Sequence, residues 1–325
     1  MDFLSLNEVL SILSATIRIS TPLIFAAMAG IFSERSGVVD ISLEGKLLAG
    51  AFAAASVAAV THSAWLGLGA AIITCMVLSL IHGFASITHK GDQVVSGVAI
   101  NIIVSGLTVV LGMAWFHRSG QTPTLSQSAR FMPIKLYGVD TISNIPIIGD
   151  IYAKLISGYD LLAYFSFVAV GVTYWVLFKT RFGLRLRAVG ENPKAVDTAG
   201  ISVSLLRYQA ILIAGILTGI GGTYISIAQN ASFSRDMSAG QGYIALAAMI
   251  FGKWKPIPAM FACFLFGFLE ALSMRLQCVS LPYIGEVPVQ LIQASPYILT
   301  VILLAGFVGR AIAPKADGVP YIKER

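Results

Sequence analysis

Charge is what this sequence has least of. Only 12% of its 325 residues are charged, while 56% are hydrophobic. A soluble globular protein carries about 25% charged residues. Long apolar stretches follow one another along the chain, and several reach the roughly 20 residues that cross a bilayer as a helix. The composition therefore predicts an all-α, polytopic membrane protein.

Cysteine and the common catalytic motifs are also lacking. Two of the three cysteines, Cys75 and Cys263, lie inside apolar stretches, which argues against a disulfide framework. No G-x-x-x-x-G-K-[ST] occurs, so the chain has no P-loop for ATP, and its four histidines show no H-E-x-x-H spacing. We therefore expect no catalytic residue, no metal and no cofactor in this chain. Residues 1–17 have no basic start and no cleavage site, which favours a permanent first span over a signal peptide.

The usual length criterion predicts about nine membrane-spanning segments, with eight to ten as the range. The two longest polar interruptions are residues 117–160 and 179–207. We expect residues 1–325 to form a single transmembrane domain with two long loops. The long segments that are free of Lys, Arg and Asp are 19–33, 47–60, 64–88, 94–116, 161–178, 208–231, 256–274 and 287–309.

The basic residues predict the orientation of the chain. Most of the 22 Lys and Arg residues fall on one set of alternate loops, which the positive-inside rule assigns to the cytoplasm. That set includes Lys46 and the loop 179–207, whereas the loop 117–160 is expected to be extracytoplasmic. The amino end then lies outside and the carboxyl end inside. This bias explains the net charge of +6 without a nucleic-acid partner. Trp254 is expected to be an interfacial anchor.

Two related stretches predict an inverted repeat. "ERSGVVDISLEGKLLAGAFAAA" (34–55) and "SFSRDMSAGQGYIALAAMIFG" (232–252) each lead from a polar, glycine-bearing approach into small apolar residues. The expected topology places the two approaches on opposite sides of the membrane. Broken helices at matching positions of two halves indicate a substrate path. The alternative is that Gly and Ala are simply common in membrane helices.

Polar side chains within the apolar segments are candidates for the substrate path. Asn101 lies in mid-segment, where it could hydrogen-bond a substrate, although packing between helices is a somewhat commoner role for such an asparagine. The only acid in the long apolar segments is Glu270. A transporter driven by protons or sodium would need a central carboxylate cluster. A single acid therefore argues against an ion-coupled transporter. The candidate path residues are Asn101, Ser105, Gln229, Asn230 and Gln241.

The stretch "VGENPKAVDTAG" (189–200) predicts a short, well-capped helix in the loop 179–207. Asn192 suits the N-cap, Pro193 the first helical position and Gly200 the position after the last turn. Ala195, Val196 and Ala199 would offer a small apolar face. An ordinary amphipathic surface helix is the alternative.

Three strings resemble one family of transporters. They are "FSERSGVVDISLEGKLLAGAFAA" (32–54), "RAVGENPKAVDTAGISV" (187–203) and "GQGYIALAAMIFGKWKP" (240–256). They resemble the permease subunits of bacterial ABC importers for simple sugars and branched-chain amino acids, within which the purine nucleoside permeases are most similar. The similarity runs over nearly the whole chain.

The resemblance implies a permease that moves a nucleoside by alternating access across the bacterial cytoplasmic membrane. Its partners would be separate ATPase subunits that bind the ATP, a second permease chain (homologous or identical) and an extracytoplasmic substrate-binding protein. The short helix would be the coupling helix that docks on the ATPase. Ribose or another simple sugar is the alternative substrate, and an ion-coupled transporter or a structural membrane protein is the alternative class. The implied coupling residues are Glu191, Asn192, Pro193, Lys194, Ala195, Asp197 and Gly200.

Overall fold

A computed structural model describes residues 6–136, 148–276 and 312–323, with short pieces at 280–281, 285–286, 294 and 298. Seven helices in this part are long and apolar enough to cross a membrane, which confirms an all-α polytopic membrane protein. They are α1 (Leu6–Arg35), α2 (Leu43–Thr61), α3 (Ala64–Gly83) continued by η1 (Phe84–Thr88), α4 (Gln93–Phe116), α7 (Leu161–Lys179), α10 (Val203–Thr223) continued by η4 (Tyr224–Gln229), and α12 (Pro256–Leu276).

The remaining elements are short. The predicted segment 287–309 lies almost wholly outside the described residues, so the number of about nine spans remains a prediction. The short elements are η2 (Gln127–Ala129), α6 (Ile148–Ile151), η3 (Tyr152–Ile156), α8 (Arg181–Glu191), α9 (Pro193–Thr198), α11 (Gln241–Phe251), and the paired strands β1 (Ser280–Leu281) and β2 (Gly285–Glu286).

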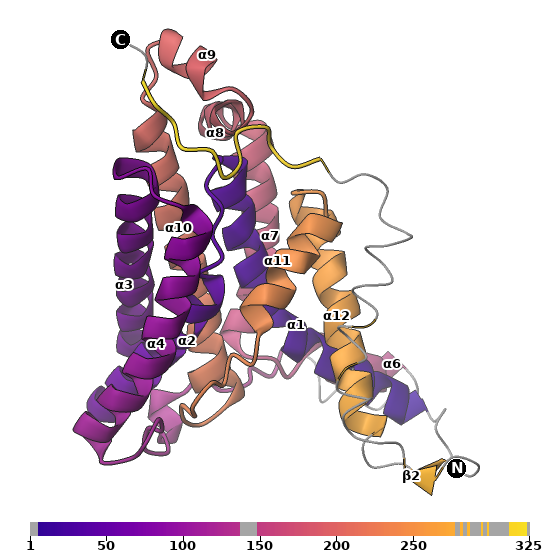
Figure 1. Ribbon diagram of the computed structural model, residues 1–325. Coiled ribbons are helices and arrows are strands. Elements are labelled where there is room, and N and C mark those ends of the chain that lie inside the picture. Colours follow the sequence, from indigo (N-terminus) through magenta and orange to yellow (C-terminus); the bar gives the residue numbers. More distant parts are fainter. Residues whose placement is uncertain are drawn as a thin grey trace.

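The helix packing follows the pattern of an internal repeat (Figure 1). Helices α1 and α10 pack together; α1 also packs on α11 and α12, and α10 packs on α2 and α3. Exchanging α1 with α10, α2 with α11 and α3 with α12 therefore maps one set of contacts onto the other. Helix α1 ends beside α8, and α10 begins just after α9, so the two central helices run in opposite directions. Such a pattern is expected of an inverted repeat.

Small residues allow the helices of this bundle to approach closely. A Cβ on Gly222 would lie 2.5 Å from the carbonyl oxygen of Leu47, and one on Gly219 would lie 2.7 Å from the Cα of Ile72. Only glycine fits at such distances, because backbone meets backbone. These contacts fix α10 against α2 and α3.

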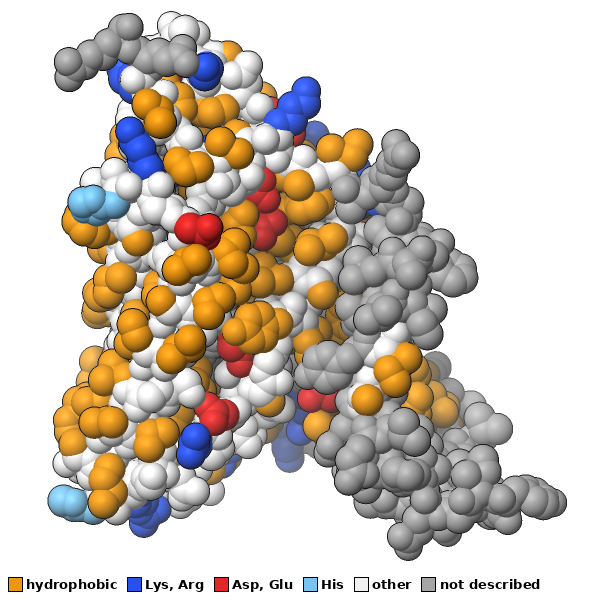
Figure 2. Space-filling model, viewed as in Figure 1, with side chains coloured by type: hydrophobic (Ala, Val, Ile, Leu, Met, Phe, Trp, Pro, Cys, Tyr) orange, Lys and Arg blue, Asp and Glu red, His pale blue; other side chains and the backbone are white. Residues whose placement is uncertain are grey.

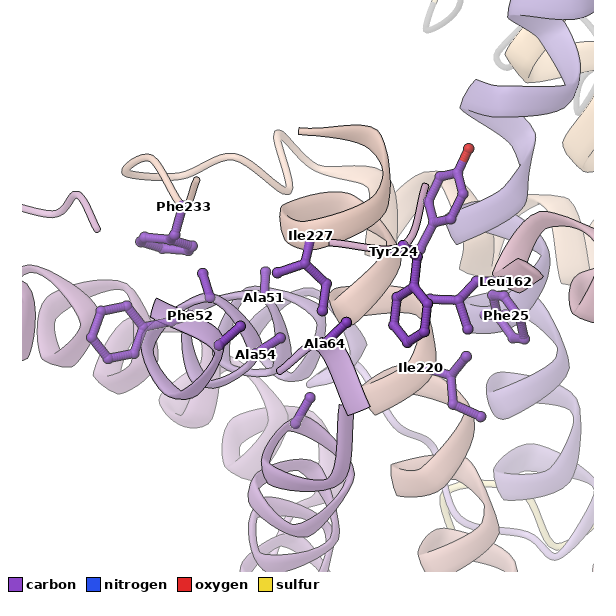
Figure 3. Packing of buried hydrophobic residues seen from close by; sticks show 14 of the residues in the cluster. Phe25, Ala51, Phe52, Ala54, Ala64, Leu162, Ile220, Tyr224, Ile227 and Phe233 are labelled. Atoms are coloured by element: carbon purple, nitrogen blue, oxygen red, sulfur yellow. The ribbon is translucent and has the colours of Figure 1, made fainter. Parts of the chain in front are cut away.

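The largest hydrophobic cluster joins α1, α2, η4 and the segment after η4 (Figure 3). Phe25, Phe52, Tyr224 and Phe233 are each at most 5% exposed. The rings of Phe52 and Phe233 meet edge to face, with centroids 5.2 Å apart. On the outside, apolar side chains cover the middle of the face shown in Figure 2, and most of its Lys and Arg side chains lie toward the two ends. This distribution suits a protein that is surrounded by lipid.

Two expectations about single residues are wrong. Lys46 does not lie on a loop: it belongs to α2, is fully buried, and its Nζ lies 2.5 Å from the Asp40 carboxylate. The partner neutralises the charge, which allows the lysine to be buried. Trp254 is not an exposed anchor either, because its side chain is buried and its indole N–H donates to the Glu34 carboxylate over 2.6 Å.

Candidate transport pathway

Two irregular segments interrupt the bundle, as the sequence predicts. Residues 36–42, which we call the connector, link α1 to α2, and residues 230–240 link η4 to α11. Helix α11 has 11 residues. At about 1.5 Å per residue it is roughly 16 Å long, about half the thickness of a bilayer core. The structure thus confirms that α11 is too short to span the membrane alone.

The starts of α2 and α11 meet at Glu44. One oxygen of its carboxylate accepts from the Ser238 hydroxyl over 2.6 Å and from the Gly240 N–H over 2.9 Å. The other accepts from the Gly242 N–H over 2.7 Å. A Cβ on Gly242 would lie 2.5 Å from the backbone of Glu44, so the contact requires glycine. The Glu44 carboxylate therefore links the start of α2 to the start of α11, which are the two positions at which the repeat is broken.

Asn101 of α4 fastens the same junction from the other side. Its Oδ1 accepts from the Gly45 N–H over 2.8 Å. Its amide group donates to the Ile41 carbonyl over 3.0 Å and to the Tyr243 hydroxyl over 2.9 Å. Both amide hydrogens are thus used within the protein, and the free capacity of the side chain is on Oδ1.

An open cavity of about 420 Å³, with polar side chains along part of its lining, lies between α2, α4, α11 and the segment 230–240. Its size is within the range of small-molecule sites, about 300–1,000 Å³. The Ser105 hydroxyl donates to the exposed Asp236 carboxylate over 3.0 Å at one wall. At another wall the ring of Tyr243 is 47% exposed. The polar side chains that line the cavity belong to Glu44, Asn101, Ser105, Asp236, Ser238 and Tyr243.

The predicted path residues divide into two groups. Asn101 and Ser105 line the cavity. Gln241 begins α11 beside it, with a buried Oε1 that has no hydrogen-bond partner among the described residues. Gln229 and Asn230 lie at the end of η4, where the Asn230 amide donates to the Ile225 carbonyl over 2.8 Å, and they do not line this cavity.

Sequence reasoning missed four polar residues of the cavity: Glu44, Asp236, Ser238 and Tyr243. Each lies in one of the two polar approaches that the sequence singles out, so the position in the repeat was an available signal. What the sequence does not reveal is that Glu44 contacts Gly240, 196 residues away.

The short helix in the loop 179–207 is confirmed as α9. Asn192 is its N-cap, with Oδ1 accepting from the Ala195 N–H over 3.2 Å, and Pro193 is its first residue. Gly200 follows the last turn with φ +79°, the left-handed conformation that glycine adopts without strain. A second helix, α8, precedes it and was not expected; its N-cap is Thr180, whose hydroxyl accepts from the Gly183 N–H over 3.1 Å.

The exposed side of α9 differs from the expected one. Glu191, Asn192, Lys194 and Ala195 are exposed. Val196 is buried, however, in a cluster that joins α8, α9 and α10, so it does not contribute to an outer apolar face. Val196 faces inward because α8 supplies apolar side chains for it to pack on. Asp197 is partly buried, and its carboxylate lies 3.4 Å from the Lys323 ammonium.

Apolar helices that are broken around a cavity, with two capped helices at one end, are typical of membrane proteins that move solutes. The chain belongs to the family described as branched-chain amino acid transport system / permease component, whose pattern matches residues 12–312. It is thus a multi-pass membrane permease.

Individual relatives cover nearly the whole chain. The nucleoside ABC transporter permease protein NupC of Lactococcus lactis subsp. cremoris is 41% identical over 312 residues, 94% of this chain and 95% of its own. The guanosine ABC transporter permease protein NupQ of Bacillus subtilis is 40% identical over 326 residues, 97% and 98% of the two chains. A protein of Haloferax volcanii with the provisional name of a glucose ABC transporter permease is 32% identical over 308 residues, 90% of each chain.

Proposed function

We propose that this chain is the membrane-spanning subunit of an ATP-driven importer of nucleosides. The observation that carries the proposal is the identity of 41% and 40%, over almost the full length, with permeases named for nucleoside and guanosine transport. Because a shared fold alone does not define a substrate, the chemistry of the cavity is the second support.

The cavity offers the groups that a nucleoside requires. A nucleoside has a flat base and a sugar with hydroxyl groups. The half-exposed ring of Tyr243 provides a face on which a base stacks. Oxygen atoms of Asp236 and Ser105 are placed to accept or donate hydrogen bonds to sugar hydroxyls. We assign the path to this cavity and extend it to the other predicted residues, Gln229, Asn230 and Gln241.

The energy for transport comes from partner subunits in this proposal. The sequence has no P-loop, so ATP binds to separate ATPase subunits, and the permease itself carries out no covalent chemistry. Helix α9 acts as the coupling helix and α8 supports it. The contacts with the ATPase are assigned to Glu191, Asn192, Pro193, Lys194, Ala195, Asp197 and Gly200.

The complete transporter contains two permease chains, homologous or identical, and receives its substrate from an extracytoplasmic binding protein. The complex lies in the cytoplasmic membrane of a bacterium. The α8–α9 end and the carboxyl end face the cytoplasm, and the amino end lies outside. ATP binding brings the ATPase subunits together and moves α9. The broken starts of α2 and α11 then shift, and the cavity opens to the other side.

The test is uptake of labelled guanosine by the assembled complex in proteoliposomes, with ATP on the ATPase side. We expect uptake that requires ATP and that other nucleosides inhibit, whereas ribose and leucine do not. Inhibition by ribose or glucose would assign the chain to sugar transport, for which the name of the Haloferax relative is the supporting observation. Uptake without ATP that an ionophore abolishes would indicate an ion-coupled transporter.

A further inference from the structure

The guanidinium group of Arg207 lies where three distant segments of the chain meet. Arg207 belongs to the first turns of α10 and is 1% exposed. Its Nε donates to the carbonyl of Ser36, the first residue of the connector, over 3.2 Å. Its Nη1 donates to the Val319 carbonyl, in the C-terminal segment 312–323, over 3.2 Å. One buried side chain therefore joins α10, the connector and the C-terminal segment.

The C-terminal segment in turn holds the helices α8 and α9. It runs past α8 toward the α9 end of the molecule (Figure 1). The Ala316 N–H donates to the carbonyl of Gly190 in α8 over 2.8 Å. Tyr321 packs against the cluster that contains Val189 and Val196. The Lys323 ammonium reaches the Asp197 carboxylate of α9. A movement of α8 and α9 must therefore also move the C-terminal segment or break these contacts.

Close backbone contacts leave little freedom at this junction. Gly37 has φ +82°, and a Cβ there would lie 2.9 Å from both the Ala316 carbonyl oxygen and the Arg207 Nη2. A Cβ on Gly190 would lie 2.3 Å from the Arg35 carbonyl oxygen. The end of α1, the connector, the end of α8 and the C-terminal segment are thus in direct contact.

The other end of the connector contacts the cavity wall through Asn101, which lines the cavity. The Val39 N–H donates to the Gln93 side chain over 2.7 Å, and the Val39 carbonyl pairs with the His82 ring over 3.0 Å. The Ile41 carbonyl accepts from the Asn101 amide, which also holds Tyr243. The seven-residue connector thus extends from the Arg207 junction to the cavity.

We propose that Arg207 is a positioning residue of the transport cycle, which makes α8, α9 and the C-terminal segment move together with the connector and so with the cavity wall. This inference rests on the proposed function. Arginine suits the position because its planar fork donates to two carbonyl groups at fixed angles, whereas the lysine ammonium is a single point on a flexible stem. Without the junction, α9 responds to the ATPase but the cavity does not follow.

The experiment compares Arg207→Lys and Arg207→Met in the complex with its ATPase subunits and binding protein. The readout is guanosine taken up per ATP hydrolysed, together with the amount of complex assembled. We expect assembly and ATP hydrolysis to persist while the ratio falls, within the range of about 5- to 150-fold that is typical of coupling between sites. Arg118→Met, which removes an exposed arginine of the loop 117–160, is the matched control and should keep the unmodified ratio.

A second variant deletes residues 314–325 and so removes the Val319 and Ala316 contacts. If the junction acts as one unit, the deletion and Arg207→Met reduce the ratio by similar factors and their effects do not add. An unchanged ratio in Arg207→Met would overturn the inference. Loss of assembly in all three variants would also overturn it, because Arg207 would then serve folding alone. If the unmodified complex takes up no guanosine, the proposed function itself fails, which is a different result.

Discussion

Gly200 sets the end of the proposed coupling helix through its backbone alone. Its φ is +79°, and no atom lies within 4 Å of the position that a Cβ would take. A side chain there would thus meet no steric clash, and the cost would be the left-handed backbone, about 1–2 kcal/mol for most residues. Asparagine tolerates that conformation better than a β-branched residue does.

We therefore expect Gly200→Val to lower ATP-driven guanosine uptake and Gly200→Asn to leave it nearly unchanged. Both variants should assemble, since the position is exposed. The measurement is the initial rate of uptake in proteoliposomes, normalised to assembled complex. Equal rates in the two variants would show that the end of α9 does not need this conformation for transport.

Tyr243 separates two contributions to substrate binding at the cavity. Tyr243→Phe keeps the ring and loses the bond from Asn101, whereas Tyr243→Leu loses both. Stacking contributes about 0.5–1.5 kcal/mol beyond buried area. We therefore expect the KM for guanosine to rise by roughly 2- to 12-fold more in the leucine variant than in the phenylalanine variant. Equal KM values in all three proteins would place the base elsewhere.

Asp317 is a partly buried acid of the C-terminal segment, which contacts α8 and α9. Burial raises the pKa of the Asp317 carboxyl from 3.8 to about 7, although the nearby Arg207 guanidinium and the Gly318 N–H act in the opposite direction. Glu34 is another acid that interacts with it electrostatically. The Asp317 carboxylate therefore binds a proton more tightly when the C-terminal segment is docked, that is, packed on α8 and α10, than when the segment is detached. Docking is strongest below about pH 4, weakens as the pH rises toward 7, and changes no further above that.

We expect the C-terminal segment to become more accessible to protease between pH 5 and pH 7. Asp317→Asn should remove most of this change, because the amide stays neutral at every pH. The measurement is the rate of cleavage within residues 312–323 of the detergent-solubilised complex, with cleavage of the loop 117–160 as an internal control. The same pH slope in the Asn variant would assign the effect to another group.

The sequence predicted some elements well and others poorly, for physical reasons. The capped helix α9 was predictable because Asn192, Pro193 and Gly200 act locally. Helix α8 was missed because its arginines read as a loop, although its apolar side chains pack against α9 and α10. Lys46 was predicted to lie on a loop because a charge within an apolar stretch usually marks the end of a membrane-spanning segment. The Asp40 carboxylate that allows its burial is brought beside it only by the fold.

At the scale of the whole molecule, the orientation in the membrane is the main prediction. We expect Lys194→Cys to react with an impermeant thiol reagent only in inside-out vesicles, and Arg118→Cys only in right-side-out vesicles. Cys75 and Cys263 are buried, and Cys278→Ser removes the third thiol. The reverse pattern of labelling would invert the proposed topology.

The repeat and the cavity show which features of the whole molecule can be predicted from the sequence. The two polar approaches were recognisable because each leads into a run of small residues. The contact between the two approaches could not be recognised from the sequence, because Glu44 lies 194 residues from Ser238 and 196 from Gly240. Seven of the expected spans are described as long helices, and the half-length of α11 follows from its composition.

The meeting of α2 and α11 has a consequence for the charge of the solute. The first turn of each helix carries roughly half a positive elementary charge from the dipoles of its peptide groups. The single negative charge of Glu44, which bonds to the start of α11 and lies in the first turn of α2, nearly cancels the two. The Asp236 carboxylate at the cavity wall is paired with the Arg235 guanidinium over 3.2 Å. The wall therefore attracts neither sign strongly, and an ion that leaves water for it is not compensated. We therefore expect this junction to suit an uncharged nucleoside better than the same nucleoside carrying a phosphate.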